Sequence, residues 1–163
     1  MMDFLTSNFG TALVFAAVAA AAVFPGLGSA KGVSIVGQAG AGVLSEDPGK
    51  FVKVLILEAL PGTQGLYGFL SAILLLSSSG ILGGTGAPIS VDKGFTYLFA
   101  AMPIAIVGYF SAIAQAKTAA AGVSGIVAKK PDDYVKGIIL SALVETYAVL
   151  ALLVSLLAIF NVK

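Results

Sequence analysis

The residue best suited to chemistry is Glu145, the only charge in the 26 residues between Lys136 and Lys163. That run is otherwise apolar enough to cross a membrane. Glu145 falls ~12 Å along a helix that begins at Gly137, close to the middle of a hydrocarbon core of ~30 Å. An ionised carboxylate at that depth costs ~3 kcal/mol even on lenient insertion scales. We therefore predict that Glu145 faces protein and takes part in an ion or proton site.

A second polar group lies in the segment LEALPGTQGLYGF, residues 57–69. Pro61 removes one backbone N–H donor and three glycines loosen the chain around it, so we expect an irregular helix here. Thr63 and Tyr67 are four residues apart and share one helix face, with Gln64 beside them. Each of these side chains alone is explained by hydrogen bonding between helices. Together they favour a site.

This combination suits a sodium ion better than a proton. A proton carrier needs a carboxylate and a group that modulates its pKa, whereas a sodium ion needs several oxygens and one negative charge. The candidate ligands are a backbone carbonyl freed near the proline and four side chains: Thr63, Gln64, Gln115 and Glu145. Tyr67 is expected to donate its O–H to Glu145 and to hold the carboxylate in place. Tyr147 points to another side of its helix.

The elements that must position these residues are membrane helices. Of the 163 residues, 58% are hydrophobic and 10% are charged, which is typical of an integral membrane protein and leaves no room for a soluble catalytic domain. The chain has no cysteine and no histidine, which argues against a transition-metal centre, and its net charge of +1 gives no sign of a nucleic-acid partner. Four transmembrane helices are predicted by the apolar stretches 11–30, 54–82, 94–116 and 137–162.

The two halves of the chain repeat each other at an offset of 83 residues without a gap. The matching positions are Pro48, Val52, Lys53, Ile56, Leu57, Ala59 and Leu60 with Pro131, Val135, Lys136, Ile139, Leu140, Ala142 and Leu143. We therefore predict an all-α membrane protein of two fused, duplicated helical hairpins, residues 1–82 and 83–163. At this offset Gly62 takes the place of Glu145, so one carboxylate serves four helices.

The distribution of lysine predicts the orientation of the chain. Seven of the nine lysines lie near the connections 45–50 and 129–133. The positive-inside rule assigns both connections to the cytoplasm and therefore puts both termini outside. The first and third helices are expected to continue past the bilayer as far as these connections.

Small residues mark one face of the first and third helices. They are Ala12, Ala16, Ala20, Gly28 and Gly32 on the first, and Gly108, Ala112, Ala116, Ala120 and Ser124 on the third. Small residues let helix backbones approach closely in lipid. We expect these stripes to serve tight packing, and they also suit the inner wall of a ring.

The segments LPGTQGLYGF, IAQAK, AKKP and VETYA resemble the proteolipid, or rotor-ring, subunit of V-type ATPases, in the bacterial sodium-translocating form called subunit K. The resemblance covers essentially the whole chain. It implies a ring of copies in the cell membrane that turns against a static membrane subunit, and a central-stalk subunit that joins the ring to a separate soluble motor. The motor hydrolyses ATP, so this chain is expected to be a non-catalytic subunit.

The resemblance also implies a site. The sodium ligands would be the backbone oxygen of Leu60 and the side chains of Thr63, Gln64, Gln115 and Glu145, with Tyr67 bonded to the glutamate. The static subunit would supply an arginine that displaces the ion. Two alternatives stay open: the same ring carrying H⁺, and an independent four-helix channel or antiporter.

One acidic residue departs from the family's pattern. Glu58 stands where a neutral glutamine is expected. Because it lies five residues after Lys53, we predict an interfacial carboxylate paired with a lysine. The loop at 77–94 is also longer than in the family, and its glycines are not followed by a phosphate-binding GK[ST] sequence.

Overall fold

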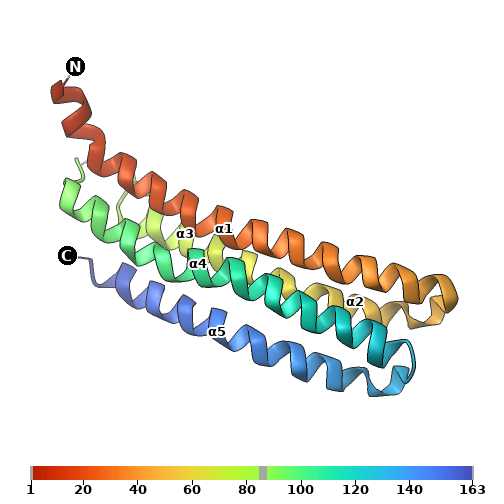
Figure 1. The fold of residues 1–163 in the computed structure, drawn as a ribbon. Helices are drawn as coiled ribbons and strands as arrows, with labels where there is room; N and C mark the ends of the chain where they lie inside the picture. Colours follow the sequence, from red (N-terminus) through yellow and green to blue (C-terminus); the bar gives the residue numbers. More distant parts are fainter. Residues whose placement is uncertain (1, 85–87, 163) are drawn as a thin grey trace.

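The protein is a bundle of long helices that run side by side (Figure 1). The computed structural model describes the backbone of residues 2–84 and 88–162, and the side chains from residue 8 onward. The helices are α1 (Met2–Glu46), α2 (Phe51–Ala59), α3 (Thr63–Ser78), α4 (Val91–Gly122) and α5 (Tyr134–Phe160). A 3₁₀ turn at Leu60–Gly62 joins α2 to α3, and a π-helical turn at Val123–Val127 extends α4.

Four segments of the described chain are long and apolar enough to cross a membrane, as the sequence predicts. They are Asn8–Glu46, Pro48–Ser78, Val91–Val127 and Pro131–Phe160. The 45 residues of α1 correspond to about 68 Å of helix, more than twice the hydrocarbon core. The expectation that the first and third helices extend past their apolar stretches is therefore confirmed.

The predicted end of the second apolar stretch, at residue 82, is wrong. Helix α3 ends at Ser78. Gly80 and Gly84 follow with φ angles of 77° and 63°, a backbone conformation that favours glycine and cannot continue a right-handed helix. The apolar residues after Ser78 therefore belong to turns.

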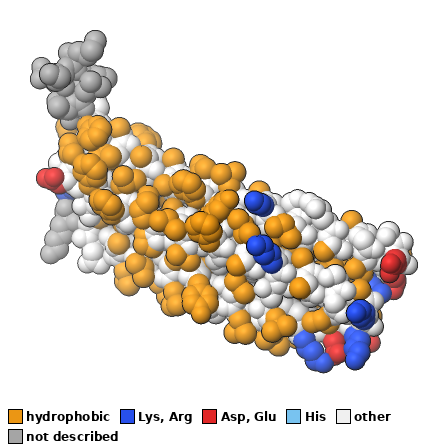
Figure 2. Space-filling model, in the orientation of Figure 1, with side chains coloured by type: hydrophobic (Ala, Val, Ile, Leu, Met, Phe, Trp, Pro, Cys, Tyr) orange, Lys and Arg blue, Asp and Glu red, His pale blue; other side chains and the backbone are white. Residues whose placement is uncertain are grey.

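Both predicted connections lie at one end of the bundle, while the first turns of α1 and the last turns of α5 lie at the other (Figure 1). Lys50 donates from Nζ to the carbonyl of Ala128 at 2.9 Å, and Lys53 pairs with Asp132 at 3.0 Å. Most of the charged side chains in Figure 2 lie at this end, with a few lysines midway along the face, and apolar side chains cover most of the half nearer the termini. The two connections therefore form one polar surface.

The small-residue stripes pack partly within the chain. Helix α1 lies against α4 over most of its length, and α4 also packs against α5. Gly28 and Gly32 of α1 and Gly108 of α4 are buried at the α1–α4 contact, whereas Ala12 and Ala16 are exposed. Close approach of the α1 and α4 backbones is thus confirmed within the chain, and only part of each small-residue stripe remains on its surface.

Two apolar clusters fill the bundle. The cluster nearer the termini includes Val14, Ala17, Leu75, Tyr97, Ile104 and Ile159. The cluster nearer the connections includes Val36, Val54, Leu57, Ala119 and Val127. Gln64 and Gln115 are fully buried and belong to neither cluster, because their positions on α3 and α4 fall between the two. This polar layer contains the candidate site.

Candidate ion-binding site

The site begins at the break in the second membrane-spanning segment. Pro61 has no N–H, so α2 ends at Ala59 and the chain passes through a 3₁₀ turn before α3 begins at Thr63. The predicted irregularity is therefore present. The carbonyl of Leu60 accepts from the backbone N–H of Thr63 and, at 3.0 Å, from its Oγ1. The break thus places a carbonyl and a hydroxyl oxygen side by side.

Glu145 comes to this break from α5. Its Oε1 accepts from the hydroxyl of Tyr67 at 2.6 Å, and its Oε2 accepts from Nε2 of Gln115 at 3.2 Å. Both carboxylate oxygens therefore have a donor, one from α3 and one from α4. Bonds to a charged acceptor are the stronger kind, so these two contacts hold the orientation of the Glu145 side chain.

The two buried glutamines connect the break to the carboxylate. Gln64 donates from Nε2 to Oε1 of Gln115 at 2.6 Å, and its own Oε1 accepts from Oγ1 of Thr63 at 3.3 Å. Hydrogen bonds thus run from the Leu60 carbonyl through Thr63, Gln64 and Gln115 to Glu145. All five predicted ligands lie in this one cluster, together with Tyr67.

Two serines that the sequence analysis did not single out belong to the same layer. Ser111 Oγ accepts from Nε2 of Gln64 at 3.5 Å and donates to the carbonyl of Val144 at 3.3 Å, while Ser141 donates to the carbonyl of Gln115 at 3.4 Å. Ser111 precedes Gln115 by four residues and so shares its helix face. That spacing is the signal that could have found it.

The carboxylate of Glu145 can be reached from the outer side of the bundle. An open pocket of about 450 Å³ lies between α3 and α5 and is lined by Tyr67, Ala142, Glu145, Thr146, Val149 and Leu150. Tyr147 is 67% exposed and does not line it. The site therefore has a buried side, formed by the glutamines, and a side on which an ion could enter.

The predicted pairing of Glu58 with a lysine is wrong. Within the described residues no ion pair involves Glu58, because Lys53 turns instead to Asp132 of the second connection. The half-buried carboxylate of Glu58 lies against α1 at Gly37, where an added Cβ would come within 2.7 Å of Oε1. The glycine makes the room that this side chain occupies.

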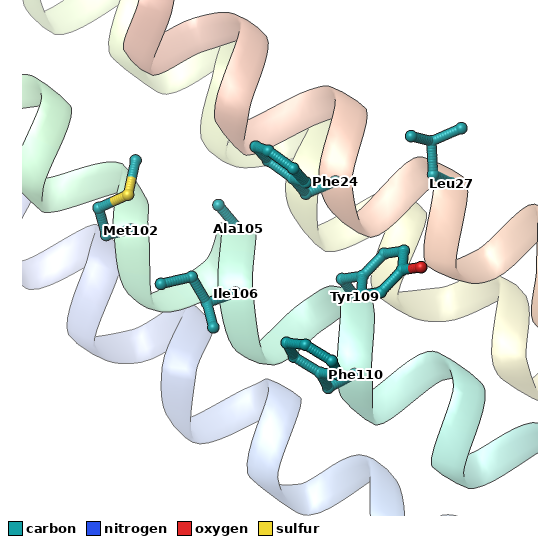
Figure 3. A pocket seen from close by; sticks show the side chains of 7 residues that line it. All are labelled: Phe24, Leu27, Met102, Ala105, Ile106, Tyr109 and Phe110. Atoms are coloured by element: carbon teal, nitrogen blue, oxygen red, sulfur yellow. The ribbon is translucent and has the colours of Figure 1, made fainter.

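A second pocket is separate from the polar layer. It has a volume of about 400 Å³ and lies between α1 and α4 (Figure 3). Its lining is Phe24, Leu27, Met102, Ala105, Ile106, Tyr109 and Phe110. Because only the tyrosine hydroxyl is polar among these side chains, the pocket offers a bare cation almost no ligands.

The chemistry of the polar layer fits a monovalent cation. It combines one carboxylate with hydroxyl, amide and carbonyl oxygens, which are the ligands that hard cations prefer. The described residues contain no group of three His, Cys, Asp or Glu side chains that could hold a metal ion. A single negative charge balances one positive charge, so a monovalent ion leaves the layer neutral.

Comparison with known proteins supports the duplicated helical fold. The family of ATP synthase C subunits matches residues 10–75 and again 98–158, once in each half of the chain. The chain is 48% identical over 162 residues to the "V-type sodium ATPase subunit K" of Enterococcus hirae, covering 99% of each protein. It is 42% identical over 137 residues to the "A-type ATP synthase subunit K" of Methanocaldococcus jannaschii, covering 84% of this chain and 57% of that protein. The chain is a multi-pass membrane protein that belongs to the family of ATP synthase C subunits, with the family's helical hairpin present twice.

Proposed function

We propose that copies of this chain form a rotor ring that carries Na⁺ across the membrane, one ion at Glu145 of each copy. The observation that carries the proposal is the cluster of oxygens around this carboxylate. Its proposed ligands are the Leu60 carbonyl, Thr63, Gln64, Gln115 and Glu145, with Tyr67 orienting the acid. The relative from Enterococcus hirae, which shares nearly half its residues, is named for a sodium ATPase.

Charge explains how binding permits rotation. With Na⁺ bound, the site is neutral and can face lipid. Without it, Glu145 is an anion whose exposure to the hydrocarbon core costs about 3 kcal/mol or more. A copy without Na⁺ therefore stays beside another protein that compensates the negative charge of Glu145, and does not move into lipid. The open pocket beside Glu145 supports exchange of the ion at such a partner.

The assembly that we propose follows from the family. Each copy contributes two hairpins, residues 1–82 and 83–163, to the ring. A static membrane subunit supplies an arginine that pairs transiently with Glu145, and a central-stalk subunit transmits rotation from the ATP-hydrolysing part. The connections 45–50 and 129–133 face the cytoplasm and both termini lie outside, which is supported by the lysines gathered at that end.

Sodium is expected to protect Glu145 from chemical modification. A carbodiimide modifies carboxyl groups, and a bound ion covers this one. In rings extracted in detergent, Na⁺ should slow the labelling of Glu145 at constant pH, whereas K⁺ at the same concentration should not. Labelling can be followed by mass spectrometry. Protection that depends on pH alone would identify an H⁺-carrying ring, and ion conduction by the purified chain without an ATPase would identify a channel.

Replacement of Tyr67 by Phe is expected to weaken sodium binding. The change removes the hydroxyl that donates to Oε1 at 2.6 Å and leaves the ring in place. Hydrogen bonds to charged groups contribute about 1.5–3 kcal/mol, part of which is offset here because the carboxylate is half-exposed. The Na⁺ concentration that halves labelling should rise about threefold to tenfold.

Tyr147 provides the matched control for this prediction. It is 67% exposed, lies two residues from Glu145 and lines no part of the pocket. Tyr147→Phe should leave the half-protecting Na⁺ concentration unchanged. Equal effects of the two substitutions would show that the Tyr67 hydroxyl does not orient the carboxylate.

A further inference from the structure

Ser29 of α1 lies beside the candidate site but provides none of the predicted ligands. Its side chain is buried, with 7% exposed, and its Oγ accepts from the backbone N–H of Gly65 at 2.8 Å. Gly65 is the third residue of α3 and directly follows Gln64. Backbone N–H groups in the first turn of a helix lack partners within that helix. Ser29 supplies such a partner from a neighbouring helix.

The approach of α1 depends on the missing side chain of Gly65. A Cβ built at this position would lie 3.2 Å from both Cβ and Oγ of Ser29, and 3.6 Å from Cα of Gly26. The first two distances are tighter than ordinary packing. Glycine therefore lets α1 come close enough for the serine hydroxyl to reach the backbone of α3.

The same face of α1 also contacts α4. A Cβ on Gly28 would lie 2.7–2.8 Å from backbone atoms of Tyr109. One turn further on, a Cβ on Gly32 would lie 2.9 Å from Cβ of Pro61 and 3.0 Å from the carbonyl oxygen of Ala112. The segment of α1 around Ser29 thus sits between the break and α4, and it sets the distance between them.

Ser29 and Gln115 each make a hydrogen bond to a neighbouring helix at the polar layer. Gln115 bonds the carboxylate of Glu145, whereas Ser29 bonds the main chain beside Gln64.

We propose that Ser29 is a positioning residue of the ion site. By accepting the Gly65 N–H, it holds the first turn of α3 in the orientation that brings Thr63 and Gln64 towards Glu145. Without this acceptor, the regular helical partner of the N–H is the carbonyl of Pro61, four residues earlier. That bond would extend the regular helix into the break and turn both ligands away from the carboxylate. This inference rests on the proposed function, because it assigns Ser29 to the sodium site.

Comparing two serine substitutions on α1 tests the role of Ser29. Ser29→Ala removes the acceptor of the Gly65 N–H, whereas Ser34→Ala removes an exposed hydroxyl that accepts only from Gln38 of the same helix, at 3.2 Å. In detergent-extracted rings, Ser29→Ala should raise the Na⁺ concentration that halves carbodiimide labelling of Glu145 about threefold to tenfold, the effect of one hydrogen bond. Ser34→Ala should not change it, and labelling without sodium should proceed in Ser29→Ala as in the unmodified ring.

A purely structural role predicts a different result. It would lower the temperature at which sodium-free Ser29→Ala rings dissociate but leave the half-protecting Na⁺ concentration unchanged, and this outcome overturns the inference. If the unmodified ring shows no protection by sodium, the proposed function fails first and the inference fails with it. Normal protection in both the unmodified ring and Ser29→Ala would reject only the role of Ser29.

Gly65→Ala gives a second test that does not depend on the assembly of Ser29→Ala rings. Alanine favours the helix by about 1 kcal/mol over glycine, so helix propensity alone predicts an equally stable or more stable ring. The added Cβ nevertheless pushes against Ser29. We expect the half-protecting Na⁺ concentration to rise about threefold to tenfold here as well. An unchanged value would overturn the inference.

Discussion

Replacement of Glu145 by Gln is expected to abolish sodium transport while the ring still assembles. Glutamine has nearly the same size and can still accept a hydrogen bond from Tyr67. It cannot neutralise the ion, so a bound Na⁺ would leave a positive charge in the membrane, at a cost of about 3 kcal/mol or more. That corresponds to a loss of affinity of about 100-fold or more, since about 1.4 kcal/mol is a factor of ten. ATP-driven uptake of radioactive sodium into vesicles containing the complete ATPase measures the effect.

Glu58 offers a control with the same chemistry. Glu58→Gln removes one acidic charge from the chain, but this carboxylate lies against Gly37 and outside the hydrogen-bonded cluster. Sodium uptake should stay close to that of the unmodified complex. If uptake survives in Glu145→Gln, or if both substitutions abolish it equally, then Glu145 is not the group that carries the ion.

Replacement of Gly28 by Ala is expected to destabilise the bundle by about 1–3 kcal/mol, the usual cost of adding a methyl group to a packed interior. A Cβ at Gly28 would lie 2.7 Å from the carbonyl oxygen of Tyr109 and 2.8 Å from its Cα. These are backbone atoms of α4, so no side chain can rotate away and the two helices must separate. The temperature at which detergent-extracted rings dissociate should fall, as measured by gel electrophoresis.

Gly42→Ala is the matched control for Gly28→Ala. It is on the same helix, and an added Cβ meets no atom within 4 Å. Because alanine favours the helix, this ring should be as stable as the unmodified one or slightly more stable. Equal stability of the two variants would mean that α1 and α4 pack less closely at Gly28 than the structure indicates.

Much of the candidate site could be predicted from local sequence. The depth of Glu145 in an apolar run follows from counting residues, because the rise of a helix and the thickness of a bilayer are constant. The break at Pro61 follows from the missing N–H of proline. Thr63, Gln64 and Tyr67 follow from helical spacing beside that break. These inferences need only one helix at a time.

Contacts between helices could not be predicted in the same way. Ser29 and Ser111 are ordinary small polar residues in sequence, and their hydrogen bonds depend on which helix faces them and at what height. The sequence predicts that Glu58 pairs with a nearby lysine, but Lys53 pairs with Asp132, which is 79 residues away. Sequence distance says little about such pairs because the bundle brings both connections to one end.

The sequence by itself determined a membrane protein of four helices in two duplicated hairpins, with a single acidic residue in the last apolar run, since hydropathy and helical period are properties of each segment alone. Only the tertiary structure decided which donors reach the two oxygens of Glu145 and how closely α1 approaches α4. It also decided that the small-residue stripes are partly used within one copy. The reason is that hydrogen bonds and backbone contacts act over about 3 Å, so they depend on the rotation and height of each helix relative to its neighbours.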